Sequence, residues 1–170
     1  NEFYGYIKSI TKLIPDSYSD YEKVLFVNDY LCSNYKYDIS IYTNPYSAIY
    51  DAFNFFKTGT GVCQAYSLSF MAIMDDLGIR SDFVSADEMN HAWNLVELNN
   101  KWYHIDVTWN DPTLGSYEND TFGCARHNYF LLSSECMMDS NHQHYGFDIS
   151  DYGYVIGNEY DDVEVNTNQS

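Results

Sequence analysis

The stretch that decides the fold is Thr58-Gly59-Thr60-Gly61-Val62-Cys63-Gln64, in which a turn-forming run leads into a mainly apolar one. A helix that ends at Gly78 is predicted from the apolar and small residues that recur at helical spacing: Val62, Ala65, Tyr66, Ser69, Ile73 and Leu77. Cys63 is then expected in the first turn of a largely buried helix. Unpaired N–H groups and the positive end of the helix dipole favour a thiolate there. The alternative is a small buried apolar side chain, the commoner fate of a free cysteine.

A β-hairpin is predicted further along the chain. Residues 91–98 and 101–109 have the pattern of two strands, and Asn99-Asn100 between them suits a tight turn because Asn tolerates positive φ. We expect Leu98 to pair with Lys101 across this turn. A shift of one residue in this pairing would send every side chain to the opposite face.

This pairing brings an imidazole and a carboxylate together. His91 and Asp106 become diagonal neighbours on one face, roughly 7–8 Å apart at the backbone. With Cys63 they supply, in chain order, the thiol, the base and the acid of a cysteine-nucleophile acyl-transfer site.

Three separated blocks of the sequence closely resemble the transglutaminase-like superfamily, and in particular its microbial branch. They are residues 61–66, 91–94 and 102–111, within a resemblance that covers about 45–135. The resemblance implies an α+β fold with a papain-like core, in which helices pack on an antiparallel sheet. It also implies that the nucleophilic Cys lies at a helix N-terminus.

The resemblance implies that Cys63 is the nucleophile, His91 the base and Asp106 the group that orients the base. The expected reaction is acyl transfer on protein or peptide amides through a thioester, with an amine acceptor giving a crosslink and water giving hydrolysis. The alternative is a catalytically idle binding or scaffold module that keeps the fold.

The groups that would stabilise the oxyanion are only partly predicted. The backbone N–H of Cys63 is one expected donor. Gln64 and Tyr50 are candidates for a second donor, and Trp93 is a candidate for oxyanion or substrate contact.

The length of 170 residues suffices for one domain with a sizeable core. We expect a catalytic domain over 1–156, with N-terminal helices at about 3–57 and the core at about 58–135, and an acidic tail or linker over 157–170. Further predicted elements are helices over about 3–14, 19–34 (opened by a capping box at Ser19), 44–56 (opened by Asn44-Pro45) and 135–138, strands over 80–86 and 129–132, and a Tyr-rich loop over 35–44.

The charge narrows the function classes. With 8 basic and 25 acidic residues, the net charge of −17 argues against nucleic-acid binding, which needs basic clusters. No stretch is long and apolar enough to cross a membrane. The acidity fits an extracellular or cell-surface protein, although acidity that only keeps the domain soluble is the simpler interpretation. The expected partner is a protein or peptide substrate, cell-envelope peptides among the candidates, and no cofactor is expected.

The four cysteines are Cys32, Cys63, Cys124 and Cys136, and their spacing fits no zinc site. Cys32 is expected in the core, and a Cys124–Cys136 bridge is predicted only for an oxidising compartment.

No metal site is expected. His142 and His144 lack a patterned carboxylate. The acids that follow the hairpin match no EF-hand loop: Asp111, Glu118 and Asp120. His104 shares the predicted face of His91 and is expected to pack or hydrogen-bond beside the site.

Overall fold

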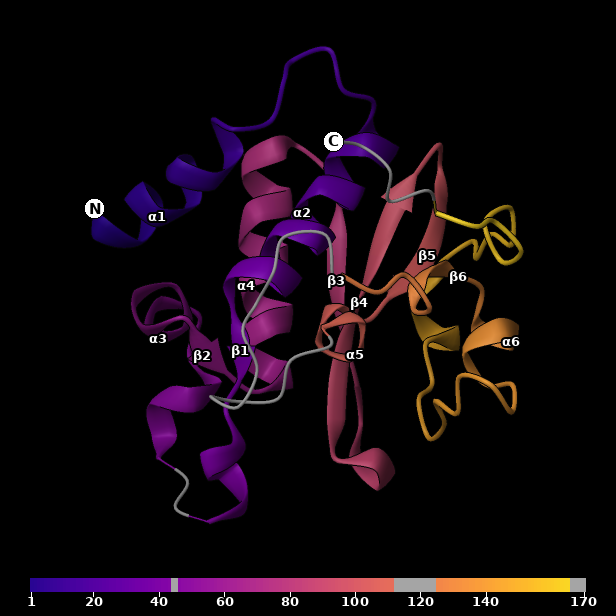
Figure 1. The fold of residues 1–170 in the computed structure, drawn as a ribbon. Coiled ribbons are helices and arrows are strands. Elements are labelled where there is room, and N and C mark those ends of the chain that lie inside the picture. The colour runs from indigo at the N-terminus through magenta and orange to yellow at the C-terminus, as the bar shows by residue number, and fades with distance from the viewer. Residues whose placement is uncertain (44–45, 112–124, 166–170) are drawn as a thin grey trace.

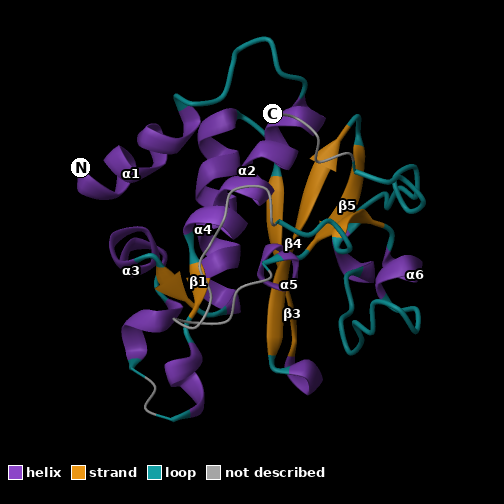
Figure 2. Cartoon of the chain, in the orientation of Figure 1, coloured by secondary structure: helices purple, strands orange, loops and turns teal. Residues whose placement is uncertain are grey.

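The computed structural model describes residues 1–43, 46–111 and 125–165, which form a helical layer against one antiparallel sheet (Figure 1). The α+β class is confirmed. The described helices and strands are α1 (Glu2–Thr11), α2 (Asp20–Asn34), β1 (Lys36–Tyr37), α3 (Ala52–Thr58), β2 (Thr60–Gly61), α4 (Cys63–Leu77), β3 (Ser81–Ala86), β4 (His91–Leu98), β5 (Lys101–Ile105), α5 (Val107–Asn110), β6 (Phe130–Leu132) and α6 (Ser134–Met137). Helices α1 to α4 lie on one side of the β3-β4-β5-β6 sheet, and α6 lies on the other (Figures 1 and 2).

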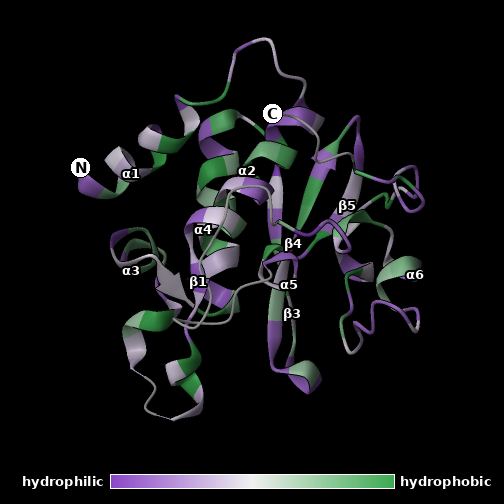
Figure 3. Cartoon of the chain, in the orientation of Figure 1, coloured by the Kyte–Doolittle hydropathy of each residue, from purple (hydrophilic) through white to green (hydrophobic). Residues whose placement is uncertain are grey.

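Local sequence signals begin and end the predicted helices. The Ser19 side chain accepts from the backbone of Glu22, whose carboxylate accepts from the Ser19 backbone, so the predicted capping box opens α2. Helix α4 begins at Cys63 and ends where Gly78 adopts φ 73°, a left-handed conformation that suits glycine. In Figure 3, α2 and α4 carry apolar and polar residues in alternating bands, as amphipathic helices do.

One predicted helix is wrong. The stretch expected to be helical up to residue 56 contains a 3-10 helix, Ser47–Tyr50, and then the separate helix α3. The break lies at Asp51, whose backbone is extended and whose side chain accepts from the backbone N–H of Asn54. An aspartate that caps a new helix therefore interrupts the old one. The predicted start at 44–45 lies outside the described residues.

The expected Tyr-rich loop over 35–44 also contains regular structure. Lys36 and Tyr37 form β1, which pairs in parallel with β2 immediately before the Cys63 helix. This pairing brings Tyr37 toward the N-terminus of α4.

The hairpin has the predicted register. Leu98 pairs with Lys101, and the ladder continues to Asn94 opposite Ile105. Asn99 and Asn100 both have positive φ, 52° and 65°, as a tight turn requires. The return strand is shorter than predicted, because it ends at Ile105 rather than continuing to residue 109.

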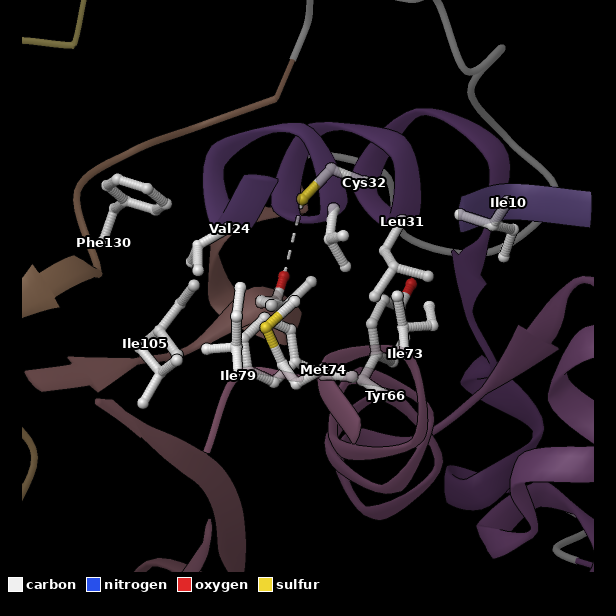
Figure 4. Packing of buried hydrophobic residues seen from close by; sticks show 14 of the residues in the cluster. Ile10, Val24, Leu31, Cys32, Tyr66, Ile73, Met74, Ile79, Ile105 and Phe130 are labelled. Atoms are coloured by element: carbon white, nitrogen blue, oxygen red, sulfur yellow. Dashed lines mark hydrogen bonds between the residues drawn. The ribbon is translucent and has the colours of Figure 1, made fainter. Parts of the chain in front are cut away.

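Two apolar clusters cover the two faces of the sheet. On the helical side, Val96 and Ile105 pack with buried residues of α2 and α4, including Leu31 and Met74 (Figure 4). Buried Cys32 belongs to this cluster, as predicted, and its thiol donates to the carbonyl of Val107 at 3.6 Å. On the opposite face a second cluster joins strand residues to α6: Val84, Trp93, Leu95, Leu132 and Met137.

The predicted linker or disordered end from residue 157 needs correction for residues 157–165. Gly157 donates to the carbonyl of Trp102, and Glu159 accepts from the Tyr103 hydroxyl at 2.7 Å. Asp161 accepts from both the backbone and the hydroxyl of Ser133. These acids are hydrogen-bonded to the domain, so the acidic composition of this stretch does not make it a separate tail.

Candidate active site

Cys63 is the first residue of α4, and its surroundings explain the glycine two positions earlier. A Cβ on Gly61 would lie 2.7 Å from the Cβ of Ala65 and 2.8 Å from the ring of Phe55, so only glycine lets this segment pack. The capping residue Val62 offers no side-chain hydrogen bond to the helix, whereas the other described α-helices have side-chain caps. The first N–H groups of α4 therefore stay available beside a half-buried thiol.

His91 and Asp106 meet as the register predicts, although Asp106 is not in a strand. Asp106 caps α5, and its Oδ1 accepts from the backbone of Trp109 at 3.0 Å. Its Oδ2 accepts from Nε2 of His91 at 2.6 Å. The His91 side chain is 7% exposed and that of Asp106 0%, so no bulk solvent weakens this pair.

The thiol of Cys63 interacts with the same imidazole, that of His91. Burial alone would lower the pKa of His91, but the charge and hydrogen bond of Asp106, and then of Cys63, outweigh it and raise the pKa to about 10. Burial likewise works to raise the pKa of Asp106, but His91 and His144 hold that pKa at about 2. The three predicted site residues therefore lie together: Cys63, His91 and Asp106.

A second histidine, which sequence reasoning did not assign to the site, also contacts Asp106. Nε2 of His144 lies 2.7 Å from the same Oδ2 that His91 contacts, and its Nδ1 lies 2.8 Å from the carbonyl of His142. His144 is fully buried, and it comes from the irregular segment after α6. The aromatic rings of Trp93, Trp109 and Tyr129 surround it, with centroids 4.8, 4.3 and 5.3 Å away.

His104 lies beside the site, as predicted, without contacting Asp106. Its Nδ1 accepts from the indole of Trp93 at 2.9 Å, and its Nε2 lies 2.8 Å from the hydroxyl of Ser134. Burial, and then the electrostatic interaction with His144, lower the pKa of His104 to about 3. Trp93 is thus a buried packing residue whose N–H is already used, which removes it as an oxyanion or substrate contact.

The cleft next to the triad differs from the hollow that contains the other two candidates. Gln64 and Tyr50 line a hollow with Phe3 and Phe53. His91 lines a separate cleft of about 400 Å³, whose other described walls are mostly aromatic: Tyr37, Tyr42, Thr108, Trp109, Asp111, Arg126 and Tyr129. Burial, and then the charge of Cys63, raise the pKa of Tyr37, which therefore lies close to the thiol.

Two groups of described residues gather potential metal ligands. One is His91, Asp106 and His144, where both rings already converge on one carboxylate oxygen. The other is Cys136, Asp139 and His142.

In the second group the contacts are those of a capped turn, because Oδ1 of Asp139 accepts from the backbones of Asn141 and His142 and contacts the His142 ring. Hydrogen bonds account for both groups, and the expectation of no metal stays a prediction. The proposed bridge partner Cys124 and the acids Glu118 and Asp120 lie outside the described residues.

A profile of the transglutaminase-like superfamily matches residues 7–107, more than half of the chain. The chain belongs to this superfamily. The match starts well before residue 45, so it includes the second half of α1 and all of α2, and it ends immediately after Asp106.

Two solved structures share the fold. One is a TGase that is 20% identical with a TM-score of 0.51, and the match covers 62% of this chain and 30% of that one. The other is a candidate cysteine protease from Cytophaga hutchinsonii, 22% identical with a TM-score of 0.51, and the match covers 62% of this chain and 37% of that one. The fold is therefore that of papain-like cysteine enzymes.

The kyphoscoliosis peptidases of Mus musculus and Homo sapiens are each 22% identical over 119 residues. The match covers 62% of this chain but 18% of each peptidase. The chain thus spans less than a fifth of the length of these relatives.

Proposed function

We propose that the chain is a cysteine acyl-transfer enzyme that acts on protein or peptide amides through a thioester. The observation that carries this proposal is the position of His91. Its ring is hydrogen-bonded to Asp106 at 2.6 Å and interacts with Cys63. A base held between a thiol and a carboxylate is the arrangement that activates a cysteine nucleophile. Membership of the transglutaminase-like superfamily supports the same reaction class.

The first half of the reaction uses the ion pair of Cys63 and His91. The thiolate attacks the amide carbonyl carbon, the C–N bond breaks, and the proton of the His91 imidazolium goes to the leaving amine. Asp106 keeps the His91 ring in one tautomer, with a proton on Nε2 directed at Oδ2. In the second half an amine or water attacks the thioester, gives its proton to His91 and releases the Cys63 thiolate.

The charge that develops on the carbonyl oxygen needs donors that are in place beforehand. The backbone N–H of Cys63 is the first, since no side chain caps α4. For the second, the Tyr37 hydroxyl replaces Gln64 and Tyr50 as the better candidate. Tyr37 shares the cleft with His91 and interacts with Cys63, whereas the other two line a different hollow.

The substrate side is a proposal drawn from the cleft and from the relatives. An open cleft with aromatic walls fits an extended peptide, because tyrosine and tryptophan offer rigid contact area. Relatives named as a peptidase and a TGase act, by those names, on proteins. We extend this to protein or peptide substrates, cell-envelope peptides among them, in an extracellular or cell-surface setting that suits the charge of −17. Fractionation of the source cells with an antibody to the chain tests the location.

Alkylation by iodoacetamide tests the nucleophile, with Cys136 as an internal control. Burial, and then the carboxylates of Asp161 and Asp139, raise the pKa of Cys136 to about 11, so this half-buried thiol should react slowly. We expect Cys63 to be alkylated at least about tenfold faster than Cys136 near pH 7. His91→Ala should remove the difference. Equal rates at both thiols in the wild type would sink the proposal and favour an idle binding module.

A second assay separates the two acceptors. The protein is incubated with a library of glutaminyl peptides and a fluorescent primary amine, and products are read by mass spectrometry. Amine adducts that disappear in Cys63→Ala identify a transferase, and cleaved or deamidated peptides that disappear identify a hydrolase. Equal yields of these products in the wild type and in Cys63→Ala would count against both a transferase and a hydrolase.

A further inference from the structure

His144 makes contacts that the Cys63, His91 and Asp106 triad does not require. We propose that His144 is a positioning residue of the proposed acyl-transfer site, holding the Asp106 carboxylate against His91 with a proton on each of its own ring nitrogens. The proposal rests on the proposed function and adds a fourth residue to it.

The first step concerns the hydrogen-bond partners of the ring. Nε2 faces Oδ2 of Asp106 at 2.7 Å, and Nδ1 faces the carbonyl of His142 at 2.8 Å. A carboxylate and a backbone carbonyl both accept hydrogen bonds and cannot donate them. Both contacts are satisfied only when both nitrogens of His144 carry a proton.

The surroundings suit a cation. The ring is fully buried, so the carboxylate of Asp106, rather than water, balances the positive charge of a protonated His144. Trp93, Trp109 and Tyr129 surround the ring, with centroids 4.8, 4.3 and 5.3 Å away, so the contact with Asp106 is shielded from water. The other titratable groups near it are Tyr129, His104 and His91, which shares Asp106.

The consequence for the reaction concerns Asp106. This buried carboxylate accepts from Trp109 at Oδ1 and from two histidines at Oδ2, and these three contacts fix its orientation. Without His144, Oδ2 would keep one donor and lose a neighbouring positive charge. The carboxylate would then be free to turn about its capping bond, and His91 would be held less firmly.

Two substitutions test whether His144 acts as a hydrogen-bond donor or only fills space. His144→Gln keeps an N–H that can reach Asp106, whereas His144→Phe keeps the aromatic volume and removes every donor. We expect iodoacetamide alkylation of Cys63 near pH 7 to fall about 10- to 100-fold in His144→Phe, the rate equivalent of one lost hydrogen bond to a charged group. The Gln variant should stay within about fivefold of wild type. The opposite order, with Phe as reactive as wild type and Gln impaired, would assign His144 to packing alone and overturn the proposal.

The matched control is His142→Ala, in the same turn. The His142 ring is half-buried and bonded to Asp139, and only its backbone carbonyl contacts His144. This variant should react as wild type does. Thermal unfolding followed by circular dichroism checks that each variant is folded.

A second measurement of the His144 ring does not depend on the reactivity of Cys63. In a long-range proton–nitrogen correlation spectrum of protein labelled with ¹⁵N-histidine, His144 should show two protonated ring nitrogens near pH 7, assigned by its loss in His144→Gln. A signal with a single protonated nitrogen would refute the proposed state even if the triad is active. If the spectrum is as expected but wild-type Cys63 is no faster than Cys136, the proposed function fails and the buried ion pair remains.

Discussion

His91 and His104 both lie beside Trp93, toward the open end of the same hairpin and in buried surroundings, yet their pKa values move in opposite directions. The pKa of His91 is raised to about 10 and that of His104 is lowered to about 3. Burial alone lowers both. What differs is the partner: His91 faces the carboxylate of Asp106, and His104 accepts from the indole N–H of Trp93.

The contrast between them shows that a buried imidazole ring is charged or neutral according to whether its neighbours accept or donate hydrogen bonds. The indole can only donate, so Nδ1 of His104 must be unprotonated and the ring stays neutral. The carboxylate can only accept, so His91 keeps a proton on Nε2 and can take a second one. One histidine of the hairpin is therefore suited to proton transfer and the other to packing.

The largest effect should come from removing the charge that distinguishes the two histidines. In Asp106→Asn, burial would dominate at His91 and lower its pKa, so the imidazolium partner of Cys63 would be lost. We expect turnover of any peptide substrate to drop about 10³- to 10⁴-fold, as in triads where the orienting acid becomes an amide. Steady-state rates with the substrate from the peptide screen measure this.

Asp139→Asn is the control for that change, because Asp139 is an exposed acid whose amide form can still cap its turn. It should leave turnover unchanged. A drop of less than about tenfold in Asp106→Asn would mean that the carboxylate does not govern His91.

The sequence contains enough information for the hairpin half of the site. Strand alternation and the Asn99-Asn100 turn predict the register, and the register predicts that His91 meets Asp106. The helix periodicity and Gly78 likewise predict that Cys63 begins a helix. These are local patterns, which a single sequence displays.

The parts that were missed depend on contacts distant in sequence. His144 reaches Asp106 from 38 positions away, on a segment without regular periodicity. Tyr37 reaches the thiol because β1 pairs with β2, and two-residue strands leave no pattern to detect. The strand predicted to run to residue 109 stops at 105 because the Asp106 side chain caps a helix, so one residue serves both the fold and the site.

The next largest effect concerns the dependence of stability on pH, where the two histidines should act on opposite sides. As pH falls below 6.5, His104 takes up a proton in the unfolded protein, whereas in the folded protein it stays neutral until about pH 3. The free energy of unfolding therefore falls toward acid pH. As pH rises above 6.5, folded His91 keeps a proton up to about pH 10 that the unfolded ring releases, so stability falls toward alkali. Asp106 adds a loss between about pH 3.8 and 2.

Urea unfolding across pH should therefore give a maximum near pH 6.5, with changes on the order of several kcal/mol at the extremes. His104→Gln should flatten the acid side only. His91→Gln should flatten the alkaline side and also reduce the Asp106 loss below about pH 3.8, because His91 holds the pKa of Asp106 down. Identical profiles for the two variants would contradict the comparison.

A smaller effect is expected from His104→Phe at neutral pH. The buried indole N–H of Trp93 loses its acceptor, which should lower the free energy of unfolding by about 1–3 kcal/mol. His104→Gln, which can still accept, should cost less. Cys63 alkylation should change by no more than about twofold in either variant, since neither contacts Asp106. A tenfold loss of alkylation would show that the packing around His104 also controls the reactivity of Cys63.

The smallest effect should come from the exposed surface of the same hairpin. Glu97 on β4 pairs with Arg80 at 3.1 Å, but the Arg80 side chain is 75% exposed, so water and salt screen the charges. Glu97→Gln should cost less than about 1 kcal/mol of unfolding free energy, and that cost should shrink in 1 M salt. Urea unfolding at low and high salt measures both. A cost as large as that of the buried His104 contact would mean that burial is not what separates the strong contacts of this hairpin from the weak ones.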